Sequence, residues 1–264
     1  MFRSQLPEPP GLRRLLFSIL RIAVGVYFGL CLMLFAFQRS LIYYPQPRQN
    51  TAGITLLALQ SQGQSINVST RPRDGDAALI YFGGNAEDVS LDMPDYAAAF
   101  PDRAIYLMHY RGYGGSSGKP AEKGIVSDAL ALFDLVHGQH SKVILIGRSL
   151  GAGVAIQVAA ARPAERLVLV TPFDSLKDPA YKAYPYLPCG LLLVDKYESW
   201  RYAPKIQAPT LILAAGNDEI VPASSTERLR TRFQSGLVHY VVIPGAGHNT
   251  ISEASNYMSL IQSG

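Results

Sequence analysis

The segment 147–151, with the sequence GRSLG, constrains the fold of this chain more than any other segment. An apolar run at 143–146 precedes it, and a helical stretch of small residues at 151–155 follows it. This is the strand, tight turn and helix that a G-x-S-x-G motif needs to hold its serine exposed. Glycine is required at both ends because a side chain there would clash with the strained turn or the packing beneath it. We predict that Ser149 is a nucleophile; the alternative is a glycine-rich turn with a capping serine.

A serine nucleophile needs a general base, and the base needs an acid that orients it. In this type of motif the acid and then the histidine follow the serine, each after a late strand. An apolar run at 210–215 leads into Asp218 and Glu219, and another at 238–243 leads into His248. We predict His248 as the base and Asp218 as its orienting acid, while the spacing leaves Glu219 open. The alternative is a charged turn and a surface histidine that cap the following helices.

Two backbone N–H groups are expected to form an oxyanion hole. The first is the N–H of Leu150, at the start of the helix after the nucleophile, where the helix dipole favours negative charge. The second is expected in the loop after the third strand, which reads Gly83-Gly84-Asn85. We predict Asn85 as this donor, with Gly84 permitting the close approach. A plain glycine turn is the alternative.

The chain from about residue 54 alternates between short apolar runs and helical patterns. The later strands are nearly continuous apolar runs, as expected of parallel strands covered on both faces. The pattern predicts an α/β fold with a doubly wound, mostly parallel eight-stranded sheet flanked by helices. The expected strands are 54–59, 65–70, 77–82, 104–109, 142–147, 166–171, 210–215 and 238–243, and the expected helices are near 86–99, 121–137, 150–162, 222–234 and 250–262.

The segment 174–208 interrupts this alternation. It is longer than an ordinary connection, rich in aromatic residues, and its prolines prevent one long helix. One interpretation is a small cap over the active site that lines a pocket for an apolar substrate. The other is a crossover whose aromatic side chains pack on the domain.

An uncharged apolar run occupies residues 22–37, and 15–20 extends it upstream across Arg21. Together they reach the roughly 20 residues that span a bilayer, and Arg21 can snorkel toward the headgroups. A cleaved signal peptide would have a shorter apolar core, and a buried core helix would keep a polar face. We therefore predict a retained single-pass anchor. The predicted organisation is a basic tail at 1–14, a transmembrane helix at 15–38, a linker at 39–53 and a globular domain at 54–264.

The net charge of +4 is unevenly distributed. Residues 1–50 carry six basic side chains and one acid, whereas the rest of the chain carries 18 basic and 19 acidic groups. The globular part lacks the basic face that nucleic-acid binding needs, so no nucleic-acid partner is expected. Four arginines precede the main apolar run and two follow it. This asymmetry places the N-terminus in the cytoplasm and the domain on the opposite side, periplasmic or lumenal/extracellular.

These residues together resemble the α/β-hydrolase superfamily and, more narrowly, its membrane-anchored BEM46-like branch. The resemblance covers nearly the whole chain and implies a serine hydrolase of esters or thioesters. The branch usually has His-Gly-Asn where this chain has Gly83-Gly84-Asn85, and the missing imidazole predicts a looser oxyanion loop. The resemblance rests on the anchor with QRSLIYYP at 38–45, YRGYGGSSG at 110–118, GRSLG at 147–151, Asp218 with Val221-Pro222, and Gly247-His248.

The sequence thus predicts a membrane-tethered serine esterase, thioesterase or lipase-like hydrolase with a small-molecule or lipid-type acyl substrate. One alternative is a non-catalytic binding or membrane-organising protein on the same fold, which the altered oxyanion loop favours. Another is a peptidase or perhydrolase of the same fold. Neither a disulfide framework nor a metal site is expected from Cys31 and Cys189. No organic cofactor is implied, because the triad chemistry needs none.

Overall fold

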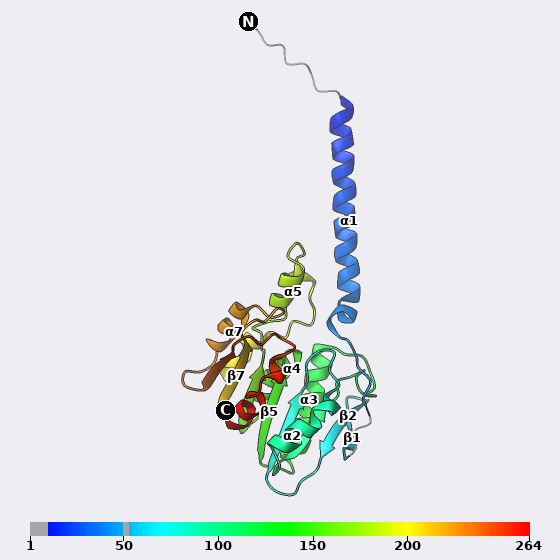
Figure 1. Cartoon of the computed structure of the whole chain (residues 1–264). Coiled ribbons are helices and arrows are strands. Elements are labelled where there is room, and N and C mark those ends of the chain that lie inside the picture. Colours follow the sequence, from blue (N-terminus) through cyan, green and yellow to red (C-terminus); the bar gives the residue numbers. More distant parts are fainter. Residues whose placement is uncertain (1–9, 50–52) are drawn as a thin grey trace.

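The computed structural model describes residues 10–49 and 53–264 of the chain. Most of the predicted basic tail at 1–14 and part of the predicted linker at 39–53 therefore lie outside the described residues. A long helix, α1 (Pro10–Ile42), stands away from an α/β body that is formed by the rest of the described chain (Figure 1).

The body is built on one eight-stranded sheet with the strand order β1-β2-β4-β3-β5-β6-β7-β8. β2 pairs antiparallel with both β1 and β4, and all other neighbours are parallel. This sheet confirms the predicted fold class, and the strands lie close to their predicted positions. They are β1 (Thr55–Ser61), β2 (Gln64–Arg71), β3 (Ala77–Phe82), β4 (Ala104–Met108), β5 (Lys142–Arg148), β6 (Arg166–Val170), β7 (Thr210–Ala215) and β8 (Val238–Ile243).

The buried apolar side chains form two clusters, and successive residues of β3 divide between them. Ile80 belongs to one cluster, and its neighbours Leu79 and Tyr81 belong to the other, because side chains of a strand alternate between faces. α3, α4 and α7 contribute to the first cluster, and α2 and α8 to the second. Both faces of the sheet are therefore covered. The bounds are α2 (Met93–Ala99), α3 (Glu122–His137), α4 (Leu150–Ala159), α7 (Ala223–Arg230) and α8 (Tyr257–Ser263), with short 3₁₀ turns η1 (Val89–Asp92), η2 (Ser199–Arg201), η3 (Ala203–Lys205) and η4 (Ile251–Glu253).

The junction between β5 and α4 is a single strained residue. Ser149 has φ +50° and ψ −114°, a left-handed conformation that is uncommon for a residue with a side chain. A Cβ on Gly151 would overlap the carbonyl groups of Phe82 and Gly83, and a Cβ on Gly147 would overlap the backbone of Gly151. Glycine at both positions is thus a packing requirement that brings α4 directly against β3.

α1 is the one helix of the described chain that is long and apolar enough to cross a membrane. Only 6% of its most apolar stretch is buried, which distinguishes it from a core helix. It begins at Pro10, whose fixed φ suits a first helical turn, and ends shortly before Pro45. The helix therefore extends beyond the predicted span of 15–38 at both ends.

The segment 174–208 has two parts with different surroundings. Its first part, residues 177–194, is called the cap segment here; it contains α5 (Lys177–Ala183) and α6 (Cys189–Leu192) and projects toward the side of α1 (Figure 1). The part that follows returns to the body, where Tyr197 is fully buried in the core. The two interpretations of the sequence thus apply to different halves of the same segment.

Gly151→Ala is expected to destabilise the protein by about 3 kcal/mol, because the new methyl group has no free volume between α4 and β3. Gly138→Ala is the matched control: its Cβ would meet only carbonyl oxygens at 3.4 and 3.5 Å, and its φ is −65°. Urea unfolding of the full chain in detergent measures both variants. Equal stability of the two would show that the β5–α4 junction has room that we do not see.

Candidate active site

Ser149, His248 and Asp218 form one hydrogen-bonded row. Nε2 of His248 lies 2.8 Å from Oγ of Ser149, and Nδ1 of the same ring lies 2.8 and 3.0 Å from the two carboxylate oxygens of Asp218. His248 is only 3% exposed. Each residue follows the carboxyl end of a parallel strand: Ser149 follows β5, Asp218 follows β7 and His248 follows β8. The structure thus brings together the three residues that the sequence predicts as nucleophile, orienting acid and base.

The two neighbouring acids at 218 and 219 hold different parts of His248. Asp218 contacts the imidazole ring, and its Oδ1 also accepts the backbone N–H groups of Ile220 and Val221 at 2.9 and 2.7 Å. Glu219 instead accepts the backbone N–H of His248 at 2.9 Å, and this hydrogen bond lowers the pKa of Glu219. The geometry therefore distinguishes an acid that orients the ring from one that holds the loop.

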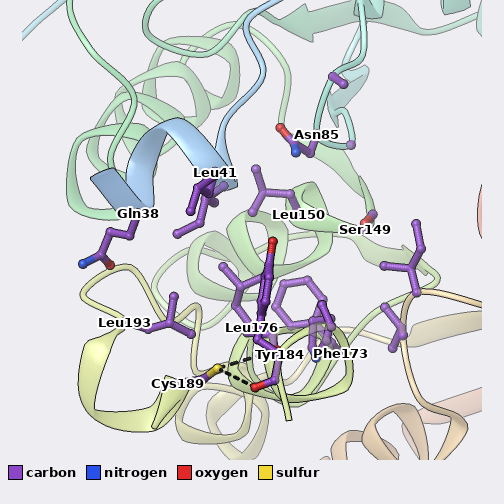
Figure 2. A pocket seen from close by; sticks show the side chains of 18 of the residues that line it. Gln38, Leu41, Asn85, Ser149, Leu150, Phe173, Leu176, Tyr184, Cys189 and Leu193 are labelled. Atoms are coloured by element: carbon purple, nitrogen blue, oxygen red, sulfur yellow. Dashed lines mark hydrogen bonds between the residues drawn. The ribbon is translucent and has the colours of Figure 1, made fainter. Parts of the chain in front are cut away.

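The predicted oxyanion donors, Leu150 and Asn85, line the cavity that Ser149 borders. Leu150 is the first residue of α4, where a backbone N–H has no partner inside the helix. Asn85 lines the same cavity as Ser149 (Figure 2). Its side-chain oxygen accepts the N–H of Tyr44 at 3.1 Å and the hydroxyl of Tyr113 at 2.9 Å. The Asn85 side chain is thus engaged by the chain that follows α1, which fixes its loop next to the serine.

The carboxylate of Glu87 holds the loop that contains Gly84 and Asn85 through hydrogen bonds. It accepts the N–H of Gly84 at 2.8 Å, the hydroxyl of Tyr81 at 2.5 Å and an N–H of Arg148 at 3.1 Å. A Cβ on Gly83 would lie 2.8 Å from the Glu87 carboxylate and would overlap Val89. Position 83 therefore has no room for an imidazole in this packing. The expectation of a looser loop did not consider Glu87, which holds the backbone N–H of Gly84, and that expectation stays a prediction.

Arg148 and Asp92 complete a polar cluster beneath the loop. Burial acts to lower the pKa of Arg148, but Glu87, together with Asp92 and two nearby tyrosines, outweighs it, so the pKa is raised. Burial, followed by the charge of Glu87 and a hydrogen bond to it, raises the pKa of Asp92 to about 8. At neutral pH Asp92 is therefore mostly protonated and hydrogen-bonded to Glu87. Arg148 also donates to the carbonyl of Asn249 at 3.3 Å, which links the serine turn to the histidine loop.

Sequence reasoning missed Glu87 and Asp92. One signal was present: Arg148 lies inside the serine motif, and an arginine on a buried turn needs an acidic partner. The two other buried histidines of the described chain do not contact Ser149, His248 or Asp218. His109 is bonded to Ser69 at 2.8 Å, and burial lowers its pKa to about 4. His140 is also buried, and its Nδ1 lies 2.8 Å from the carbonyl oxygen of Gly75.

A largely apolar cavity of about 640 Å³ adjoins Ser149 and His248. Figure 2 shows Leu41 of α1 on one side of it and Tyr184 and Leu193 of the cap segment on another. Its volume falls within the roughly 300–1,000 Å³ of small-molecule sites. Within the described lining, the one carboxylate is Glu87, which is already engaged by Gly84 and Arg148.

An eight-stranded, mostly parallel sheet with a serine on the strained turn between β5 and α4 defines the α/β-hydrolase class. The family model described as serine aminopeptidase, S33 matches residues 95–196 and 197–255, which together make up more than half of the chain. The chain belongs to this α/β-hydrolase family.

Similar proteins occur in bacteria and in eukaryotes. Rv2307c of Mycobacterium tuberculosis, described as uncharacterized, is 35% identical over 248 residues, which cover 88% of this chain and 87% of that protein. Protein bem46 of Schizosaccharomyces pombe is 27% identical, with 75% and 68% covered. Among solved structures, the Pyrococcus furiosus esterase Pf2001 has a TM-score of 0.69 at 17% identity, with 83% of this chain and 95% of that chain covered. This last likeness supports the fold alone.

Replacing Asp92 by asparagine is expected to flatten the dependence of stability on pH. The carboxyl has an ordinary pKa of 3.8 and a folded-state pKa of about 8. Its stabilising contribution is therefore full below pH 4 and is lost as the pH rises to 8. The free energy of unfolding of the wild type should fall, relative to Asp92→Asn, by up to about 1 kcal/mol per pH unit in this range.

Urea unfolding of the full chain in detergent at pH 5, 6, 7 and 8 measures this slope. Asp95→Asn, which removes an exposed acid from the first turn of α2, three residues after Asp92, is the control substitution. Parallel pH profiles for the wild type and Asp92→Asn would contradict the protonated Asp92.

Proposed function

We propose that this protein is a membrane-anchored serine hydrolase that cleaves carboxylic esters or thioesters with an apolar acyl group. The observation that carries the proposal is the Ser149–His248–Asp218 row beside an apolar cavity. A nucleophile, a base and an orienting acid at hydrogen-bond distance are the parts that acyl transfer requires.

The reaction proceeds through an acyl-enzyme. Oγ of Ser149 attacks the carbonyl carbon while Nε2 of His248 takes its proton, and Asp218 holds the ring and stabilises its charged form. The N–H groups of Leu150 and Asn85 bind the oxyanion. His248 then gives its proton to the departing alcohol or thiol. Water, activated by the same histidine, hydrolyses the acyl-enzyme and regenerates Ser149.

The cavity favours an acyl ester over a peptide. An aminopeptidase site needs a carboxylate that receives the ammonium group of the substrate, and the one carboxylate in the described lining, Glu87, already neutralises Arg148. Most of the lining is apolar, and α1 and the cap segment both contribute apolar side chains to it. The support for ester substrates is therefore the composition of the cavity rather than the name of the family.

The proposed anchor is α1, which has the length and composition of a membrane span. We propose that its basic N-terminal side faces the cytoplasm, because arginines are retained on that side of a membrane, and that the catalytic domain lies across it.

Fluorophosphonate labelling of the full chain in detergent tests the nucleophile. These probes react with activated serines, so the wild type should be labelled, and labelling should fall at least about 10³-fold in Ser149→Ala and His248→Ala. Ser175→Ala, another buried serine, is the control and should keep the label. Unlabelled but folded wild type would favour a non-catalytic binding protein.

Asp218→Asn and Glu219→Gln make the same chemical change in adjacent residues. We expect Asp218→Asn to lower kcat for p-nitrophenyl butyrate by about 10³–10⁴-fold, since the amide favours the wrong tautomer of His248. Glu219→Gln keeps an acceptor for the His248 N–H and should lower kcat less than about tenfold. Equal losses would contradict the assigned roles.

A further inference from the structure

The last turns of α1 are hydrogen-bonded to the end of the cap segment and to Asp195, which directly follows it. The side chain of Gln38 donates to one backbone carbonyl of this segment at 2.9 Å and accepts one of its N–H groups at 2.7 Å. Arg39 pairs with the buried Asp195 at 2.9 Å, and Asp195 also accepts the hydroxyl of Tyr43 at 3.1 Å. These contacts fix the direction of α1 relative to the catalytic domain.

A second contact shows how far the cap segment reaches along α1. The hydroxyl of Tyr27 donates to the carbonyl of Tyr186 at 3.1 Å. The uncharged part of α1 lies between Arg21 and Arg39, a length of about 27 Å at 1.5 Å per residue. This is close to the roughly 30 Å hydrocarbon core of a bilayer. Tyr27 lies about 18 Å along the helix from Arg39, so the tip of the cap segment lies beside the apolar middle of the span.

The surface of the cap segment suits this environment. Residues 183–194 carry no charged side chain. Tyr186 is 89% exposed, Leu191 is 84% exposed and Val194 is 53% exposed. Exposed large apolar side chains gathered next to an apolar helix of this length mark a membrane-contacting surface.

The same two elements form walls of the cavity at the nucleophile. Leu34 and Leu41 come from α1, and Leu187 and Leu193 come from the cap segment. Figure 2 shows Leu41 and Leu193 in the same view as Ser149, which borders the same space. α1 is therefore part of the substrate site as well as the proposed anchor. A soluble substrate would have no need of a cavity walled by a membrane helix.

We propose that the substrate is an acyl ester that resides in the bilayer, and that its chain enters the cavity from the leaflet, between α1 and the cap segment. This inference rests on the hydrolase function proposed above. In this arrangement the cap segment is immersed in the leaflet, and the ester bond moves from the lipid to Ser149 without its chain crossing water.

Two substrates with one leaving group test the proposal: p-nitrophenyl butyrate in solution and p-nitrophenyl palmitate in phosphatidylcholine vesicles. The full chain is reconstituted in these vesicles. The ratio of palmitate to butyrate turnover is compared among wild type, Leu41→Trp and Leu191→Glu. Leu41→Trp fills the α1 wall of the cavity, whereas Leu191→Glu charges an exposed position of the cap segment.

We expect the ratio to fall at least tenfold in both variants. Leu91→Glu, which charges a 52% exposed leucine in η1, is the matched control and should keep the wild-type ratio. Fluorophosphonate labelling in detergent verifies that each variant is folded. A wild-type ratio in Leu41→Trp and Leu191→Glu, with butyrate turnover that depends on Ser149, would overturn this inference and leave the hydrolase function intact. Absence of labelling and of all turnover would overturn both.

Discussion

The absence of space between α4 and β3 is the constraint on which the site depends. A single residue separates the end of β5 from the start of α4. Gly151 lies so close to the carbonyl groups at the end of β3 that no side chain fits at this position. The chain can make this connection only through a residue in a strained conformation, and that residue is Ser149. The same approach brings the loop after β3 next to the serine, so the strained conformation of Ser149 and the position of this loop have the same cause.

The sequence predicted those parts of the protein that depend on short segments. The strands were recognisable as buried apolar runs, and the order of Ser149, Asp218 and His248 placed them at the carboxyl ends of three parallel strands. It predicted Asp218 as the orienting acid but could not exclude Glu219, since the spacing does not give the direction of either side chain. Only the folded loop shows that one reaches the imidazole and the other the backbone of His248.

The unpredicted parts rest on contacts between distant residues. Glu87 and Arg148 are 61 positions apart, and nothing local indicates that the acid would fill the space beside Gly83. Likewise, Arg39 and Asp195 are separated by 156 positions. In the sequence, Glu87, Arg39 and Asp195 resemble ordinary surface charges, and Arg148 indicates only that some acid must lie near it. Their meaning comes from burial, because a charge removed from water must find its partner nearby.

The contacts between α1 and the rest of the protein fix the orientation of the domain relative to this helix. A tether made of flexible chain would let the domain tumble and approach the bilayer in many orientations. The contacts of Gln38 and Arg39 remove this freedom. With α1 in a membrane, Ser149 would be held at a fixed distance from the bilayer midplane. The enzyme would then select substrates by where their ester bond lies along the membrane normal, in addition to its chemical surroundings.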